Sequence, residues 1–409
     1  MKKGYPALLA GLALCAAGLA AWIFQIVQGL QVTNLSNLFS WGLYMGSFEF
    51  FIALATGGML VFSIAYIWKV ESLMPFGKLA SLCAFANVAA AGVAIMTDLG
   101  QPFRVLQMLL TPNIGSPLFW DVVILGLYAL ITLAAVIIQF TPELKKNKGN
   151  RGALADAQDR SRKLSFVALP YLVMLNAGTA LMFAVQKSRE WWHSAILPVD
   201  AVAVGLAAGV AIMLLVQVIM VDEKKYELWK DGFVILARIG AAALFAHFVF
   251  TFLEIVTISW NGGLEGKELL HIVFGRYGLL FFLEMVLPFV AMIAWFFYQG
   301  GSRKMLGTMS ALVVISMFIQ KMMHLLPAFN VISLSLPAGG AENKLWSFPI
   351  SSGFFKEGQN LFVRSWDYMP TLPEIAVGLL PVGILIIILA GANVLFSVIS
   401  EVPGLDTTS

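Results

Sequence analysis

The sequence predicts an all-α integral membrane protein with about ten transmembrane helices. Of its 409 residues, 59% are hydrophobic and only 12% are charged, and the mean hydropathy is +0.85. A soluble domain carries about 25% charged residues. Apolar runs of roughly 20 residues recur along the whole chain, and each is long enough to cross a hydrocarbon core of about 30 Å.

Ten segments are predicted to span the membrane. They are residues 7–31, 41–68, 79–97, 119–140, 164–186, 196–221, 233–260, 277–299, 305–326 and 373–399. The first is kept as a helix because its apolar run exceeds the 7–15 residues of a signal peptide. We expect one membrane domain over residues 1–409. Within it, spans 2–5 (residues 41–186) form one four-helix bundle and spans 6–9 (residues 196–326) a second, with spans 1 and 10 flanking them.

The basic residues predict the orientation, because cytoplasmic loops collect Lys and Arg. One side of the predicted topology carries sixteen of them, and the other side carries eight. Seven of the sixteen lie between Lys145 and Lys163, within residues 141–163, which we expect to form a solvated loop. Both termini are therefore expected in the cytoplasm. The opposite, outer side then carries the connection between spans 3 and 4 and a long loop, residues 327–372.

The stretch from Met96 to Asp121 differs from an ordinary connector, because it brings two acids, an arginine and a tryptophan to the outer face. Glu49 lies about 12 Å below that face on span 2, at 1.5 Å per residue. Asn87 and Asp98 are three helical turns apart on span 3, and Asp121 begins span 4. We expect these groups to converge near the outer face. The alternative is that such charges only anchor helix ends.

The second half of the chain carries its own ionisable residues within spans, where they are costly and usually face a protein interior or water. His247 and Glu254 share one face of span 7, Glu284 lies on span 8, and Lys321 and His324 lie near the outer end of span 9. Two interpretations stay open. The residues His247, Glu254, Glu284 and Lys321 form a proton route, or they form internal ion pairs such as Lys321 with Glu254 or Glu284.

Several classes of redox centre are disfavoured. Cys15 and Cys83 both lie in apolar runs and are not grouped as an iron–sulfur cluster requires. A haem between two helices needs two facing histidines, and the depths of His247 and His324 differ by about two turns. A lipid-soluble quinone instead needs a groove, an aromatic wall and acids that exchange its protons. The outer half of spans 2–4 supplies these, with Tyr44 and Trp120 beside the acids. There we expect Asp98 to pair with Arg104 across the turn, and Asp121, with Glu49 opposite, to face the quinone ring.

Short motifs distributed over nearly the whole chain resemble one family. TDLGQPFR followed by SPLFWD is similar to the "DLGRP…S…WD" pattern of the NrfD/PsrC family of polysulfide-reductase-type membrane subunits. WGLYMGSFEFFIALATGGM and WWHSAILPVDAVAVGLAAG resemble further segments of that family. HFVFTFLEI, YGLLFFLEMVLPFVAMI and DYMPTLPEIAVG are similar to its ten-helix branch, which includes the hydrogenase subunit HybB. The chain departs from the pattern at Gln101, where the family has Arg, and it lacks the "HHSS"-type histidines of some members in span 5.

The resemblance implies a subunit that interacts with quinone, either menaquinone or ubiquinone, and binds no haem or iron–sulfur cluster of its own. It implies a ferredoxin-like iron–sulfur partner on the outer face. Beyond that partner it implies a catalytic subunit: a molybdopterin enzyme, a hydrogenase or a multihaem cytochrome. The quinone chemistry of the family falls on Glu49, Asp98, Arg104 and Asp121, with Asp121, Glu49 and Asp98 as acid–base groups and Tyr44, Asn87 and Trp120 completing the site. No nucleic-acid partner is expected.

We therefore expect a respiratory subunit of a bacterial or archaeal cytoplasmic membrane, which carries electrons between the iron–sulfur partner and the quinone pool. Whether protons are translocated is left open. The aromatic residues of the outer loop, Trp346, Phe354, Phe355 and Trp366, are predicted to dock the partner. Two other functions remain as alternatives: a secondary transporter with its ion site at Glu254, Glu284 and Lys321, and a purely structural membrane anchor.

Overall fold

The computed structural model describes residues 4–36, 39–145, 151–330, 335–337, 345–347 and 368–396. Ten of its helical segments are long and apolar enough to cross a membrane, and they match the ten predicted spans one for one. The elements, in chain order, are α1 (Tyr5–Gln28), η1 (Leu30–Val32), α2 (Leu43–Ile67), η2 (Glu71–Phe76), α3 (Gly77–Asp98), η3 (Pro102–Arg104), α4 (Val105–Leu110), α5 (Pro117–Leu144), α6 (Arg151–Ala184), α7 (Leu197–Met220), α8 (Glu223–Leu228), α9 (Lys230–Asn261), α10 (Gly263–His271), η4 (Ile272–Arg276), α11 (Gly278–Phe296), α12 (Arg303–Asn330), β1 (Ser335–Pro337), β2 (Leu345–Ser347) and α13 (Leu372–Leu395). The predicted all-α membrane class is confirmed.

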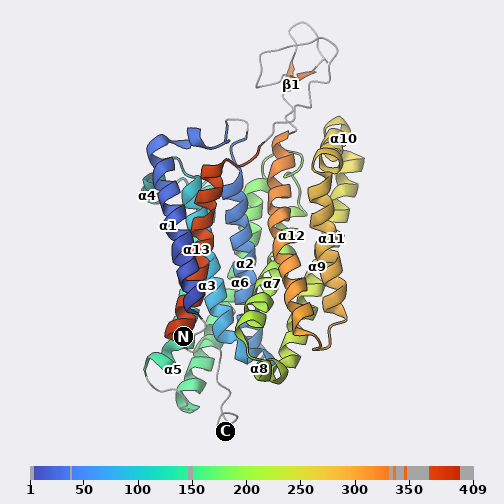
Figure 1. Ribbon diagram of the computed structural model, residues 1–409. Coiled ribbons are helices and arrows are strands. Elements are labelled where there is room, and N and C mark those ends of the chain that lie inside the picture. The colour runs from blue at the N-terminus through green and yellow to red at the C-terminus, as the bar shows by residue number, and fades with distance from the viewer. Residues whose placement is uncertain are drawn as a thin grey trace.

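The long helices run roughly parallel to one axis, so the molecule has two ends (Figure 1). The start of α1 and the end of α13 lie at one, which we call the terminal end. The other, the loop end, carries α4, α10 and the antiparallel pair β1–β2. The predicted topology makes the loop end the outer one.

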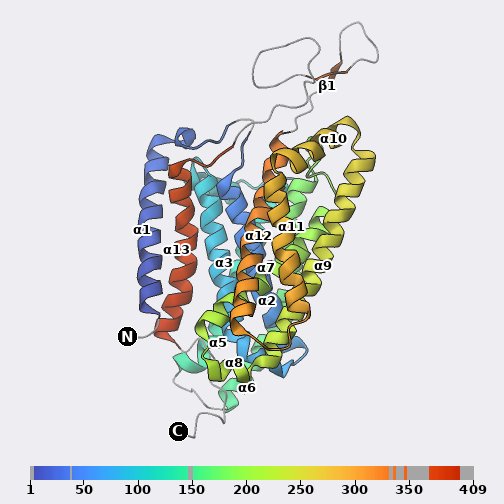
Figure 2. The ribbon, with the colours of Figure 1, turned by 45° about the vertical axis from the view of Figure 1, so that its right-hand side comes forward.

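Two groups of helices contact each other through α2 and α7. In the first group α2 contacts α3 and α6, and α5 contacts α3 and α6. In the second, α9 contacts α7 and α11, while α12 contacts α11 and α7. Helices α1 and α13 lie side by side in both ribbon views and reach the rest through α3 (Figure 2). These contacts support the division into two four-helix bundles, which we retain as a proposal.

Helix α2 is the centre of the assembly. It is buried on nearly all sides, whereas α1 exposes most of its surface. The crossing of α2 with α7 depends on glycine, because the backbones of Gly57 and Gly209 touch and neither position has room for a Cβ atom. Small residues allow this close approach of membrane helices. The crossing holds the two groups together next to Glu49, which lies two turns away on α2.

Helix α6 begins earlier than its predicted span, at Arg151 instead of residue 164. The sequence suggested a solvated loop over residues 141–163. Instead, i,i+4 ion pairs join Asp156 to Arg160 and Asp159 to Lys163 on an exposed helical surface. Such pairs stabilise the exposed surface of a helix.

Candidate functional site

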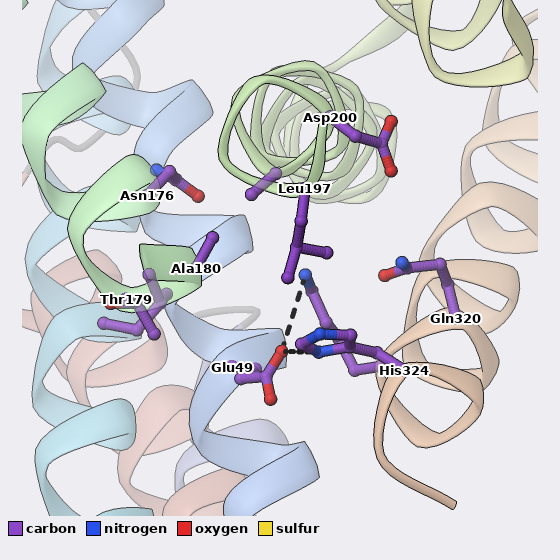
Figure 3. Close-up of a pocket in the computed structure, with 11 residues that line it drawn as sticks. Glu49, Asn176, Thr179, Ala180, Leu197, Asp200, Gln320 and His324 are labelled. Atoms are coloured by element: carbon purple, nitrogen blue, oxygen red, sulfur yellow. Dashed lines mark hydrogen bonds and ion pairs between the residues drawn. The ribbon is translucent and has the colours of Figure 1, made fainter. Parts of the chain in front are cut away.

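Glu49 joins the two groups of helices. Its side chain is buried, and its Oε2 atom lies 2.9 Å from Nδ1 of His324 and 3.8 Å from Nζ of Lys321 (Figure 3). Both partners are on α12. The sequence-based suggestion that Lys321 pairs with Glu254 or Glu284 is therefore wrong. A buried carboxylate needs an opposite charge and hydrogen bonds, and α12 supplies both to Glu49.

A cavity of about 380 Å³ lies beside this pair, between α2, α6, α7 and α12. Its lining residues are Glu49, Ile52, Asn176, Thr179, Ala180, Leu197, Asp200, Ala201, Gln320, Lys321 and His324. Two polar atoms on its wall, Oε1 of Glu49 and Nε2 of His324, are buried and have no hydrogen-bond partner in the described part of the chain. Buried polar atoms are nearly always satisfied, so this cavity suits a ligand or water with both donor and acceptor groups.

Aromatic side chains enclose His324 from the loop end. The ring centroids of Phe183 and His324 are 4.8 Å apart in an edge-to-face arrangement. The indole of Trp192 donates a hydrogen bond to the His324 carbonyl oxygen at 2.7 Å, and Trp41 packs against both Phe183 and Trp192. Because these rings fix the position of His324, its unpaired nitrogen is held toward the cavity side of α12.

Asp121 does not line the cavity, but it contacts a residue that does. Its Oδ1 atom accepts a hydrogen bond of 2.7 Å from the hydroxyl of Thr179, which lines the cavity, and the charge of Glu49 is near enough to act on it. The predicted proximity of Glu49 and Asp121 is therefore present. The expectation that Asp121 itself faces the ligand is not met, because Thr179 stands between them.

The other predicted first-bundle residues do not line this cavity. Asp98 lies near Glu374 at the start of α13, and the hydroxyl of Tyr44 donates to Gln25 of α1. The Asn87 amide donates to the Cys83 carbonyl within its own helix. Tyr44 and Asp98 lie near each other and near Glu374, but they do not join Glu49 and Asp121 at the cavity, because the face of α3 that bears Asp98 turns toward α13.

Arg104 and Trp120 are exposed at the loop end. Among the described residues no ion pair joins Arg104 to Asp98, contrary to the expectation that the two pair across the turn. The Trp120 indole donates to the carbonyl of Ile114 within the same connection. The exposed neighbours Phe103, Leu106 and Leu110 give this segment an apolar surface, as expected of a chain that lies at a membrane edge.

The second-half residues gather around a second, adjoining cavity of about 540 Å³, which contains His247, Glu254 and Glu284 in its lining. Lys321 is absent from that lining and belongs to the Glu49 pair. The group that completes the cluster is Asp200 of α7, whose Oδ1 atom is 2.8 Å from Nδ1 of His247.

Sequence reasoning missed Asp200, Asn176, Thr179 and Gln320, and considered His324 only as a haem ligand. Asp200 could have been found, because it is an acid in the first turn of an otherwise apolar helix. Asn176 and Thr179 are three residues apart on one face of α6, which gave a weaker signal. Among the docking residues, Trp346 lies in β2 opposite Leu336, and Phe354, Phe355 and Trp366 lie outside the described residues.

Similarity to known proteins decides the family. The family model described as "Polysulphide reductase, NrfD" matches residues 31–333, which include both groups of helices. The chain belongs to the NrfD family. The match runs from η1 through α12 and contains every residue that lines the two cavities.

Three curated relatives are similar to this NrfD-family chain. The C subunit of selenate reductase from Mesobacillus selenatarsenatis is 23% identical over 80% of the chain and 83% of its own length. A protein of Halobacterium salinarum, named as a candidate membrane subunit of dimethyl sulfoxide reductase, is 31% identical over 54% of the chain and 52% of its own length. The Hdr-like menaquinol oxidoreductase integral membrane subunit of Archaeoglobus fulgidus is 24% identical over 49% and 47%. The chain thus spans about half the length of two of them.

Proposed function

We propose that this NrfD-family protein exchanges electrons between an extracytoplasmic iron–sulfur subunit and the quinone pool of a bacterial or archaeal cytoplasmic membrane. Support comes from the family and from relatives whose names describe subunits of a reductase and of a menaquinol oxidoreductase. We further propose that the loop end is extracytoplasmic and that a catalytic subunit follows the iron–sulfur subunit.

One observation carries the choice of site. Oε1 of Glu49 and Nε2 of His324 are buried, lack partners among the described residues and lie beside the same 380 Å³ cavity, next to an aromatic wall. A quinone ring carries two oxygen atoms that accept hydrogen bonds, or donate them once reduced, and its faces are apolar. These residues therefore fit a quinone head group better than they fit an ion, which would need several converging ligands of one charge.

A bound quinone supplies the redox chemistry, in which two electrons and two protons are exchanged between quinone and quinol. The protein's part is to position the ring and to move the protons. Glu49 can take or give a proton at Oε1 while Lys321 neutralises its charge, and His324 can do the same at Nε2. Thr179 connects this region to Asp121, which can hold a further proton. A carboxylate held in such a groove is a suitable acid–base group in either direction.

The transporter alternative needs Glu254, Glu284 and Lys321 to form one ion site. Lys321 instead pairs with Glu49, and it does not line the cavity that contains the two glutamates. A purely structural anchor leaves the unpaired groups at Glu49 and His324 without an explanation. Neither alternative is favoured by a specific observation.

Asp121→Asn tests the proposed chemistry. The asparagine can still accept the Thr179 hydrogen bond, so the complex should assemble, while quinone-linked turnover should fall by about 10²-fold, the size expected for the loss of an acid–base group. Turnover of the partner subunits with an artificial one-electron mediator is the control and should stay at the wild-type value. Wild-type quinol turnover in this variant would show that Asp121 is only structural.

A further inference from the structure

The second cavity forms an acidic chamber, which we define by Asp200, His247, Glu254 and Glu284. It lies between α7, α9, α11 and α12, with Trp191, Phe250 and Phe281 among its apolar lining residues. His247 is hydrogen bonded to Asp200, and Glu254 accepts a hydrogen bond of 2.6 Å from the Ser194 hydroxyl. Its lining thus contains three carboxyl groups and two imidazoles, since His324 also belongs to it.

Two atoms of the chamber point to water inside it. Nε2 of His247 and Oε2 of Glu284 are buried, and neither has a hydrogen-bond partner among the described residues. Both side chains are more than nine-tenths buried. Buried polar groups without protein partners are usually satisfied by ordered water, provided that the cavity is polar and large enough. The chamber meets both conditions, because ionisable side chains line it and it has room for water.

The chamber adjoins the Glu49 cavity. Four residues line both cavities: Leu197, Asp200, Gln320 and His324. Nδ1 of His324 is hydrogen bonded to Glu49, and Nε2 of the same ring has no partner among the described residues. His324 itself lines both cavities. The polar groups next to Glu49 on this side, which can receive protons that it exchanges, therefore belong to the second helix group.

The chamber is polar toward the loop end. Glu254 is half-buried, and its partner Ser194 belongs to the connection between α6 and α7, residues 185–196. Trp191 and Ile196 of the same connection line the chamber and are also only partly buried. Water at the loop end is thus separated from Glu254 by a short surface connection.

An apolar layer closes the chamber toward the terminal end. Val210 lies about 15 Å beyond Asp200 along α7. Toward the same end, Leu244 lies about 5 Å beyond His247 on α9, Ala291 about 11 Å beyond Glu284 on α11, and Met317 about 5 Å beyond Gln320 on α12. All four are fully buried. The buried amide of Gln217 lies beyond this layer, about 26 Å from Asp200 along the helix. Ser310 and Ser316 of α12 are also buried on this side, but their hydroxyls donate to carbonyl oxygens of their own helix. None of these three polar residues lines the chamber, whose polar lining lies in the half nearer the loop end.

We propose that the acidic chamber is a one-sided proton path between Glu49 and water at the loop end, and that the second helix group is not a transmembrane proton channel. This inference rests on the proposed quinone function. Oxidation of one quinol delivers two electrons, one after the other, to the iron–sulfur subunit, and two protons to Glu49 and His324. Those protons pass through the chamber to the loop end, and reduction of a quinone uses the same path in reverse.

Cysteine labelling of the whole complex in sealed vesicles tests the path independently of turnover. In a Cys15→Ser and Cys83→Ala background, Thr251→Cys places a thiol in the chamber lining and Met213→Cys places one in the apolar layer. A membrane-impermeant, positively charged thiol reagent should modify Thr251→Cys from the loop end only and should not modify Met213→Cys from either side. Labelling of Thr251→Cys from the terminal end would overturn the proposal, as would labelling of Met213→Cys from either side.

The equilibrium between quinol and a water-soluble one-electron acceptor at the loop end gives a second test. If each proton crossed the whole membrane, 100 mV of imposed potential would shift this equilibrium about 50-fold per proton. The one-sided path predicts no shift. Suppose that the equilibrium depends on the potential while Asp121→Asn still lowers quinone-linked turnover as predicted. That result would overturn the path and leave the proposed function standing. Wild-type turnover in Asp121→Asn together with wild-type turnover in Glu49→Gln would instead remove the function on which the path rests.

Discussion

At the scale of single residues, burial and pairing separate Glu49 from the other acids of the first half. Glu49 is held by Lys321 and His324, whereas Asp98 has a buried Oδ1 atom without a partner among the described residues and lies near the charge of Glu374. Glu374 has a clear structural role, because it accepts hydrogen bonds from the backbone of Asn34 and from the Tyr368 hydroxyl. Burial and the Glu374 charge raise the pKa of Tyr368, which keeps it protonated as the donor.

Asp98→Asn should therefore stabilise the protein, because it removes a charge that is buried beside another carboxylate. We expect the free energy of unfolding to rise by about 1 kcal/mol, the modest end of such effects. The measurement is the thermal midpoint in detergent, which should be higher. Quinone-linked turnover should stay near the wild-type value. A lower midpoint would support the prediction from sequence that Asp98 is paired, and a large loss of turnover would place it in the quinone site.

At the scale of helices, the site depends on the crossing of α2 and α7 at Gly57 and Gly209. Gly57→Val should separate the two helices, since the added side chain meets the Gly209 backbone. Overpacking of this kind costs about 1–3 kcal/mol, and quinone-linked turnover should fall because Glu49 and His324 move apart. Gly126→Val is the matched control, because nothing lies within 4 Å of a Cβ atom at that position. Equal thermal midpoints for the two variants would contradict this role of the crossing.

The pair β1–β2 is the described part of the loop that we propose as the docking surface for the iron–sulfur subunit. Deletion of residues 335–347 removes Trp346 and should release that subunit during purification, while the helices remain inserted. The measurement is the ratio of the two subunits in the purified complex. An unchanged ratio would show that the docking surface lies elsewhere on the loop end.

At the scale of the whole molecule, the sequence was sufficient for the class and the number of spans, because each span must be long and apolar whatever it contacts. It was also sufficient to select Glu49 and Asp121, since buried charges in membrane helices are few. It did not reveal that α12 reaches α2, because contacts between distant helices leave no local pattern. For the same reason Lys321 was assigned to the wrong carboxylate, and Asp98 to the wrong cluster.

The quinone ring, in the function proposed above, binds in the cavity between the two helix groups. Photolabelling of the whole complex with a photoreactive quinone, followed by mass spectrometry of its peptides, tests this placement most directly. We predict modified residues in the segments 49–52, 176–180 and 320–324, and competition by the natural quinone. Modification confined to the stretch 98–121, at the exposed loop end, would contradict it.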